Sequence, residues 1–361
     1  MNLIELHILQ SFPVTCLNRD DLGAPKSALF GGVPRARVSS QCWKRAVREY
    51  FHNTDKQFSE TVRTKYLLHL FADTIKKEDH SKSDEDSISI AKKILSVSSG
   101  DKKLFGKLDD RKGIVDTLFF ISEQTATAIV KYVLKKLSEN ESYTPTFREI
   151  SEMLKEQVSD AADIALFGRM VAADATNTVE GAALFSHALS THAVRSELDF
   201  FSAVDDEKKD ADDAGAGQIG TIEYSSACYY RYIGVNLDLL KRSNLFNQEQ
   251  ITAVLENFVR AAILANPSAR KNSMFGQGLP SYVLAIKRSG QPISLANAFE
   301  KPVLAKNGGF VEPSIAAIKK EWADIKAAFG IDGGVECEIE KGKEGTASLA
   351  DVLGKILADI G

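Results

Sequence analysis

One basic segment, RARVSSQCWKRAVREYF at positions 35–51, holds the residues best suited to bind a ligand. On a helix, its polar and basic residues follow the spacing i, i+3, i+4 and i+7 and share one face: Gln41, Lys44, Arg45 and Arg48. Ser39 and Ser40 come at the start of that helix, where backbone N–H groups and the helix dipole favour an anion. Donors at one end and cations along one side are what a phosphate chain requires. The alternative is the solvated outer face of an amphipathic helix.

A second basic element, PSARKNSMFGQG at positions 267–278, has the composition of a loop. Its glycines allow close backbone approach, and Arg270, Lys271 and Asn272 offer hydrogen-bond donors. A surface hairpin loop is the alternative. Two such elements in one chain favour nucleic-acid binding more than either does alone.

The distribution of charge supports this interpretation, although the net charge is −4. Five basic residues and no acid lie between positions 35 and 48, whereas six acids and two lysines gather in positions 205–213. Segregated charge on a mildly acidic chain predicts a local basic groove rather than a generally adhesive surface.

Motifs typical of enzymes are absent from the sequence. No H-E-x-x-H, Walker loop, G-x-S-x-G or dinucleotide glycine fingerprint occurs, so we expect no cofactor and no catalysis. The four cysteines are scattered without a C-x-x-C pair, which indicates neither zinc nor disulfides and fits a reducing cytoplasm. Asp20 and Asp21 could hold a divalent metal for phosphodiester cleavage, although adjacent aspartates are more typical of turns.

Local patterns predict the elements that position these residues. Ser40 is expected to cap a helix over 41–52, whose apolar stripe of Trp43, Val47 and Tyr50 or Phe51 faces the core. Residues 11–40 hold six glycines and prolines and are expected to be mostly loop. Asn247, with Gln250 three residues later, resembles a capping box. Further helices are predicted over 58–77, 120–138, 146–165, 313–329 and 347–359, and strands over 3–10, 226–236 and 281–287.

This order of elements predicts an α+β fold with a ferredoxin-like, or RNA-recognition-motif, sheet. Two inserts, 53–163 and 172–224, would interrupt it, and a short strand near 164–170 would complete four strands. The second insert is polar, and its stretch DDEKKDADDAGAGQ is expected to be flexible. Phe200 and Phe201 lie inside it with little core to join, so a partner surface is the more credible role for them. No run of about 18 apolar residues occurs, which excludes a membrane-spanning helix, and no basic segment precedes the N-terminal residues as in a signal peptide.

Long blocks of the chain resemble one known family in order. The resemblance begins with CLNRDDLGAPKSALFGGVPRARVSSQCWKRAVR (16–48). It continues in IALFGRM (164–170), HALSTHAVRSELDFFSAVDD (187–206), GTIEYSSACYYRY (220–232), ISLANAFEKPV (293–303) and GGFVEPSI (308–315). The blocks strongly resemble the CasC backbone subunits, the Cas-seven family, of the type I-E CRISPR Cascade complex.

The resemblance implies a right-hand shape. It implies a palm at 1–52, 164–171 and 225–304, helical fingers at 53–163, a thumb hairpin at 172–224 and C-terminal helices at 305–361. Copies would stack as a helical filament along a CRISPR RNA, kink it at intervals and present its bases to target DNA. The implied partners are that RNA, other copies of this chain and the remaining Cascade subunits: the small subunit, the subunit that binds the five-prime handle, the RNA-processing endonuclease and the large subunit.

The family's RNA contacts carry over onto particular residues of this chain. They fall on Asn18, Arg19, Ser39, Ser40, Gln41, Lys44, Arg45 and Arg48. Arg169 and Met170 match residues beside the kinked nucleotide, and Phe200 and Phe201 match the thumb's apolar wedge. Weaker matches are Arg270, Lys271 and Lys301. The acidic stretch 205–213 departs from the pattern and would repel phosphate.

The fingers resemble the family least, and Lys131, Lys135 and Lys136 are the residues there that a contact with target DNA would use. The alternative function is metal-dependent RNA cleavage through Asp20 and Asp21, because backbone subunits of related type III complexes use an aspartate in an analogous place.

Overall fold

The computed structural model describes residues 1–360 except 55–60, 157–161, 172–173, 204–217 and 243–246. The chain divides into two compact units. We call the first the sheet unit; it consists of Met1–Tyr50, Leu184–Asn236 and Leu255–Gly361. We call the second the helical unit; it consists of Phe51–Ala183 and Leu237–Val254.

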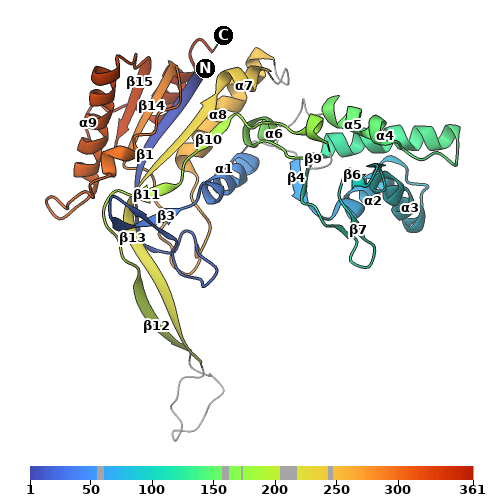
Figure 1. Cartoon of the computed structure of the whole chain (residues 1–361), viewed down its shortest axis with the longest axis horizontal. Helices are drawn as coiled ribbons and strands as arrows, with labels where there is room; N and C mark the ends of the chain where they lie inside the picture. Colours follow the sequence, from blue (N-terminus) through green and yellow to red (C-terminus); the bar gives the residue numbers. More distant parts are fainter. Residues whose placement is uncertain (55–60, 157–161, 172–173, 204–217, 243–246, 361) are drawn as a thin grey trace, which may run out of the picture. The chain divides into compact units, whose positions relative to one another are not determined.

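The sheet unit is built on one antiparallel sheet (Figure 1). Its strands, in spatial order, are β15 (Val335–Glu340), β14 (Tyr282–Ser289), β1 (Asn2–Thr15), β13 (Gln218–Asn236), β11 (Ala188–Ser190), β3 (Val33–Val38) and β2 (Ser27–Phe30). β10 (Ala183–Phe185) and β12 (Glu197–Ala203) pair with β13 outside this path. The central four strands therefore follow the order β14-β1-β13-β11, with α1 (Ser40–Thr54) between β1 and β11 in the chain and α8 (Gln248–Leu264) between β13 and β14.

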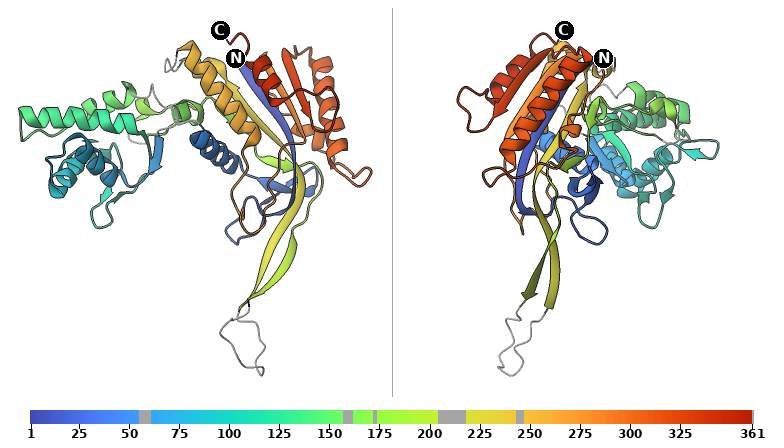
Figure 2. Two further views of the ribbon diagram at one scale, coloured as in Figure 1. Left: turned by 180° about the vertical axis from the view of Figure 1, so that it is seen from behind. Right: turned by 60° about the vertical axis from the view of Figure 1, so that its left-hand side comes forward.

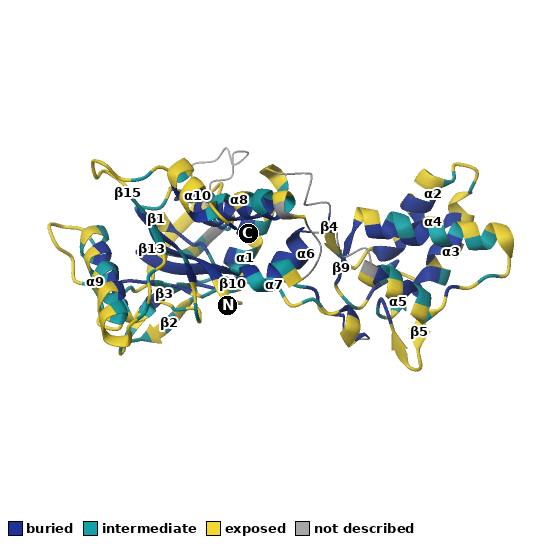
Figure 3. Cartoon of the chain, turned by 90° about the horizontal axis from the view of Figure 1, so that it is seen from above, coloured by how far each residue is buried: buried dark blue, intermediate teal, exposed yellow. Residues whose placement is uncertain are grey.

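Both faces of the central strands are covered, as the buried colour of β1 and β13 shows in Figure 3. On one face, Leu9 and Tyr230 pack with Trp322 of α9 (Val311–Phe329). On the other, Phe12 packs with Trp43 of α1. The polar positions of β1 are consequently buried as well: the Glu5 carboxylate pairs with the Arg288 guanidinium at 2.6 Å, and the Tyr232 hydroxyl donates to it.

The prediction that residues 11–40 are mostly loop is wrong. β1 continues to Thr15, and β2 and β3 form a hairpin in which Phe30 pairs with Val33. Gly31 and Gly32 form its two-residue turn with φ of +59° and +76°. Positive φ at both central positions defines the turn that matches strand twist, and glycine adopts it without steric cost. The glycines therefore mark a hairpin rather than an unstructured segment.

The predicted strand at 164–170 is also wrong. Residues Ala162–Phe167 form the helix α6 in the helical unit, and the chain turns at Gly168, whose φ is +82°. The outer strand beside β13 is instead β11, within the predicted thumb. The pattern IALF was misassigned because a short apolar run fits a buried helix as well as a strand.

A long hairpin extends from the sheet. Residues Gln218–Tyr224 of β13 pair with β12, whereas the segment from Ser225 onward pairs with β1. Figures 1 and 2 show that the β12–β13 pair projects away from the other strands. The acidic stretch 205–213 lies outside the described residues, and so does the predicted flexible stretch 205–218 except for Gln218, which is the first residue of β13. The predicted strand at 226–236 is confirmed and belongs to this longer strand.

The helical unit holds the predicted fingers and also the segment 164–171 that the resemblance assigned to the palm. Its helices include α2 (Leu67–Glu78), α3 (Asp84–Leu95), α4 (Glu123–Glu139), α5 (Phe147–Glu156), α6 and α7 (Leu237–Arg242). Short strands accompany them: β4 (Thr61–Thr64), β5 (Ser98–Ser99), β6 (Lys102–Lys103), β7 (Leu108–Asp109), β8 (Ile114–Val115) and β9 (Phe119–Ser122). Phe105 packs edge-to-face on Phe71 and Phe119 at the centre of its core.

The helix predicted over 58–77 starts too early, because β4 occupies Thr61–Thr64, while residues 55–60 are outside the described part. The helices predicted over 120–138 and 146–165 correspond to α4, α5 and α6, with residues 157–161 not described. The reciprocal hydrogen bonds between Asn247 and Gln250 confirm the capping box of α8.

The C-terminal region holds α9 and α10 (Leu349–Leu357) as predicted, with the unpredicted β15 between them. Among the residues described, no helix is long and apolar enough to cross a membrane.

Candidate nucleic-acid interface

The apolar stripe of the basic helix α1 is buried, and its Trp43 packs in one cluster with Phe12 and Tyr229 of the sheet. Trp43, Val47 and Phe51 are all buried, as the spacing predicted. The helix begins one residue earlier than expected, because the hydroxyl of Ser39 accepts the N–H of Cys42 at 3.3 Å. Ser39 is therefore the capping residue, and Ser40 is the first helical residue.

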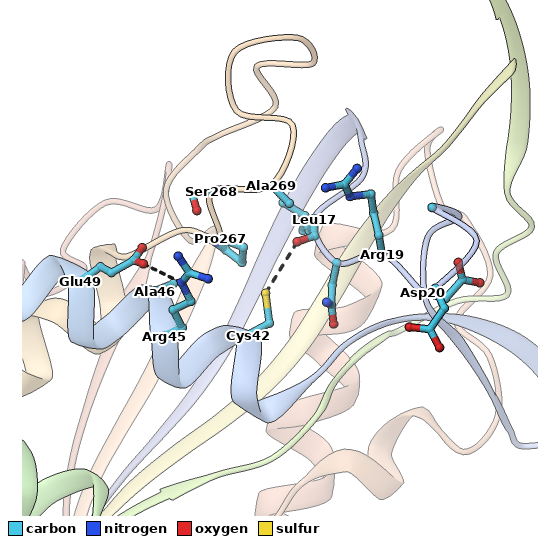
Figure 4. Close-up of a pocket in the computed structure, with 13 residues that line it drawn as sticks. Leu17, Arg19, Asp20, Cys42, Arg45, Ala46, Glu49, Pro267, Ser268 and Ala269 are labelled. Carbon is cyan, nitrogen blue, oxygen red and sulfur yellow. Dashed lines mark hydrogen bonds and ion pairs between the residues drawn. The ribbon is translucent and has the colours of Figure 1, made fainter. Parts of the chain in front are cut away.

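A recess of about 550 Å³ lies beside α1 and collects several of the predicted contacts (Figure 4). It is lined by the loop after β1, by one face of α1 and by the start of the second basic loop: Leu17, Asn18, Arg19, Asp20, Asp21, Gly23, Cys42, Arg45, Ala46, Glu49, Pro267, Ser268 and Ala269. Three segments that are far apart in the sequence therefore meet in one place within the sheet unit. The Asn18 side chain fastens two of them, since its carbonyl oxygen accepts the Ser39 N–H at 2.9 Å.

The polar face of α1 continues from the recess onto the neighbouring helix surface. Gln41 is exposed and Lys44 and Arg48 are half-buried. The ammonium of Lys44 lies 5.6 Å from the centre of the Phe185 ring, and partial burial lowers the pKa of Lys44. The Ser40 N–H donates to Nδ1 of His187 at 3.3 Å. Sequence patterns did not single out Phe185 or His187 for this surface, because only the long-range pairing of β10 and β11 brings them to α1.

The second basic loop is held at its neck by buried polar side chains. The Gln10 amide donates to the Asn266 side chain and to the Gly278 carbonyl, both at 2.7 Å. Arg231 donates to Gln10 at 3.0 Å and to the last carbonyls of α8, and its guanidinium lies 4.1 Å from the centre of the Trp43 ring. Burial lowers the pKa of Arg231 to about 9. This chain of contacts places the loop relative to α1.

Within that loop, the backbone of Arg270 has a φ of 54°, a left-handed conformation that residues other than glycine rarely adopt. Lys271 is exposed beside it. Local strain of this kind is found disproportionately at functional sites. The structure thus brings the loop to the recess through Pro267–Ala269, with Arg270 and Lys271 following directly.

Lys301 is exposed on a loop that a second buried arginine holds in place. Arg35 donates hydrogen bonds to four backbone carbonyls, those of Phe30, Ser190, Phe299 and Glu300. Lys301 follows directly after this anchor. It does not line the recess described above.

Arg169 does not present its charge to solvent. Its guanidinium is buried in the helical unit and donates to the carbonyls of Asn177 and Leu154, each at 3.3 Å, and burial lowers its pKa to about 10. Met170 beside it is 80% exposed. The contact that the resemblance assigned to both residues is therefore available to Met170 alone in this structure, with Arg169 as its anchor.

Phe200 and Phe201 lie on the projecting hairpin and differ in exposure. Adjacent residues of a strand point to opposite faces, and Phe200 is 73% exposed whereas Phe201 is 40% exposed. The Phe201 ring lies against its cross-strand partner Gly220. Phe200 is thus the more available of the two for a partner.

The aspartates of the alternative hypothesis also line the recess. Asp20 is part of a turn, because its Oδ1 accepts the N–H groups of Leu22 and Ala24, both at 2.9 Å. In the described part of the chain, no three His, Cys, Asp or Glu side chains are grouped as they would be around a metal ion.

Comparison with known proteins defines the class of this chain. The sequence model of the family described as CT1975-like protein matches residues 4–356, and the chain belongs to this family. The match confirms the resemblance to the backbone subunits of the Cas-seven type. A search of curated protein sequences found no significant match.

Solved structures with similar folds include the following two. One is a chain described as "CRISPR RNA-guided surveillance complex, pre-nicking", with a TM-score of 0.85 and 26% identity, covering 99% of this chain and 100% of that chain. Another is a chain described as "CRISPR RNA-guided surveillance complex", with a TM-score of 0.75 and 23% identity, covering 99% of each chain. At 23% identity, the match to the second of these chains shows a similar fold and no more.

Proposed function

We propose that this chain binds a CRISPR RNA along its sugar-phosphate backbone, as one of several copies that form the spine of a type I-E surveillance complex. One observation carries the proposal: Asn18 and Arg19 of the loop after β1, Arg45 of α1 and the start of the second basic loop line one recess of the sheet unit. Phosphate contacts position a nucleic acid without reading its sequence, which suits a protein that must accept any spacer. The family membership and the two similar complexes support it.

The strand order supports an RNA-recognition-type palm. A β-α-β-β-α-β path with its strands in the order β14-β1-β13-β11 is ferredoxin-like. In this proposal the projecting hairpin is the thumb, with Phe200 as the apolar wedge, and Met170 lies beside the displaced nucleotide. The partners are further copies of the chain and the other subunits of the complex, in the cytoplasm.

The test is co-expression with a CRISPR array, followed by sequencing of the RNA that copurifies with the full chain. The proposal expects array-derived RNAs of many spacer sequences to be enriched. Copurified RNA that matches general cellular RNA in composition, or the absence of RNA, would count against it. An array whose repeats are scrambled provides the control.

We also propose that the chain does not cleave the RNA it binds. The turn around Asp20 gives that carboxylate a structural role, and among the residues that the structure describes no third His, Cys, Asp or Glu joins Asp20 and Asp21 as a metal ligand. The alternative, metal-dependent cleavage, has a direct test. Labelled RNA incubated with the chain and Mg²⁺ or Mn²⁺ should stay intact, and products that vanish in Asp20→Ala or Asp21→Ala would establish the alternative.

A further inference from the structure

The recess carries more negative charge than a phosphate-binding site requires. Asp20, Asp21 and Glu49 line it together with the cations Arg19 and Arg45. The loop turn that involves Asp20 accounts for one of these acids. Glu49 pairs with a side chain instead: its carboxylate accepts the Nε–H of Arg45 at 2.6 Å (Figure 4).

The Arg45–Glu49 pair engages one of the guanidinium N–H donors that could otherwise bind a phosphate, the Nε–H. Both residues lie on α1, one turn apart, and both line the recess. The arginine precedes the glutamate, which is the weaker orientation for such a pair on a helix. An exposed pair of this kind is held loosely enough to exchange for a phosphate, but the exchange costs part of the binding free energy.

We infer that Glu49 is a specificity-determining residue that restrains Arg45 and so weakens RNA binding by a single copy. The inference rests on the proposed function. A chain that binds any sequence through phosphates also binds unrelated cellular RNA, and a restrained arginine lowers the affinity of every isolated encounter. Several copies on one RNA overcome this restraint together, because each further binding event on the same RNA is intramolecular and raises the overall avidity well above the affinity of one copy. Stable binding is thereby reserved for the assembled complex.

The experiment compares Glu49→Gln with a matched control. Arg148 and Glu152 on α5 form the same i,i+4 pair, with Nε–Oε1 at 2.9 Å, and the arginine is again the more exposed partner. Glu152→Gln therefore makes the same change of net charge and breaks the same kind of pair, in two residues that do not line the recess. Affinity of the purified full chain is measured for several unrelated single-stranded RNAs across a salt series.

Glu49→Gln is expected to bind every RNA about two- to fivefold more tightly, the range that an exposed ion pair contributes. The salt slope should steepen by roughly 0.7, one further phosphate contact on a single strand. Glu152→Gln should match the wild type. Because the expected result is a gain of affinity, partial unfolding cannot produce it. An unchanged or reduced affinity of Glu49→Gln overturns the inference.

Arg45→Gln separates restraint from simple repulsion. If Glu49 acts by holding Arg45, Glu49→Gln gains nothing in the Arg45→Gln background. A gain that persists there overturns the inference, since Glu49 would then repel phosphate directly. The same assay tests the proposed function separately. If the wild type binds RNA and the double variant Lys44→Glu with Arg48→Glu binds it more weakly, the proposed function is supported whatever the result for Glu49→Gln. If no variant binds RNA, both proposals fall.

Discussion

The two phenylalanines of the hairpin give the sharpest prediction, because the structure separates residues that the sequence treats as a pair. Phe200 hides only about a quarter of its surface, so Phe200→Ala should cost well under about 1 kcal/mol of unfolding free energy. Phe201 hides more than half and lies on Gly220, so Phe201→Ala should cost about 1–2 kcal/mol, a few degrees in melting temperature at most. If Phe200 wedges beside a base, its loss should remove about 1–3 kcal/mol per copy from RNA binding, or at least fivefold in affinity.

The assay pairs the melting temperature of the isolated chain with the yield of RNA-containing complex. Phe329→Ala is the matched control, since Phe329 is 76% exposed and lies at the end of α9, away from the hairpin. We expect Phe200→Ala and Phe329→Ala to melt like the wild type, with only Phe200→Ala losing complex. Normal assembly by Phe200→Ala, or a loss that appears only in Phe201→Ala, would refute the assignment of Phe200 as the wedge.

Three further predictions concern the sheet unit. Lys44→Glu with Arg48→Glu should weaken binding to all unrelated RNAs to a similar extent. The slope of log affinity against log salt concentration should flatten by about 1.4, the contribution of two phosphates on a single strand. A loss of affinity confined to one spacer would contradict this prediction. Burial lowers the pKa of His7 to about 3, below its ordinary value of 6.5, so the unfolded chain takes up a proton first as the pH falls. At pH 5.5, His7 should therefore lower the free energy of unfolding by about 1.4 kcal/mol. In His7→Gln, the free energy of unfolding measured with denaturant should fall less between pH 7 and 5 than it does in the wild type. An equal fall in both proteins would contradict this prediction. Gly31→Ala should destabilise the folded chain by several kcal/mol, because its Cβ would collide with the backbone carbonyl of Glu300. Gly32 has open space around it, so Gly32→Ala should cost only about 1–2 kcal/mol of backbone strain. Equal melting temperatures of the two variants would contradict this prediction.

The sequence was most informative where a property is local. The spacing of Trp43, Val47 and Phe51 predicted which face of α1 is buried, and Asn247 with Gln250 predicted how α8 begins. Helix periodicity and capping depend on residues a few positions apart, so one sequence contains the whole signal.

Long-range arrangement explains what the sequence could not predict. Arg169 matches a nucleic-acid contact by its position in a motif, yet its guanidinium is satisfied by backbone carbonyls inside the helical unit. Arg35 and Arg231 likewise donate to carbonyls from distant segments, and nothing in their immediate neighbours distinguishes them from surface arginines. The same limit applies to His187, which reaches α1 only through strand pairing.

The central claim, that copies of this chain line up along the phosphate backbone of one RNA, is tested most directly by counting copies. Complexes are purified on CRISPR RNAs whose spacers are lengthened in steps, and native mass spectrometry gives the number of chains on each RNA. The account predicts that the number rises stepwise with spacer length and does not depend on spacer sequence. A constant number of copies, or one that follows sequence rather than length, would contradict it.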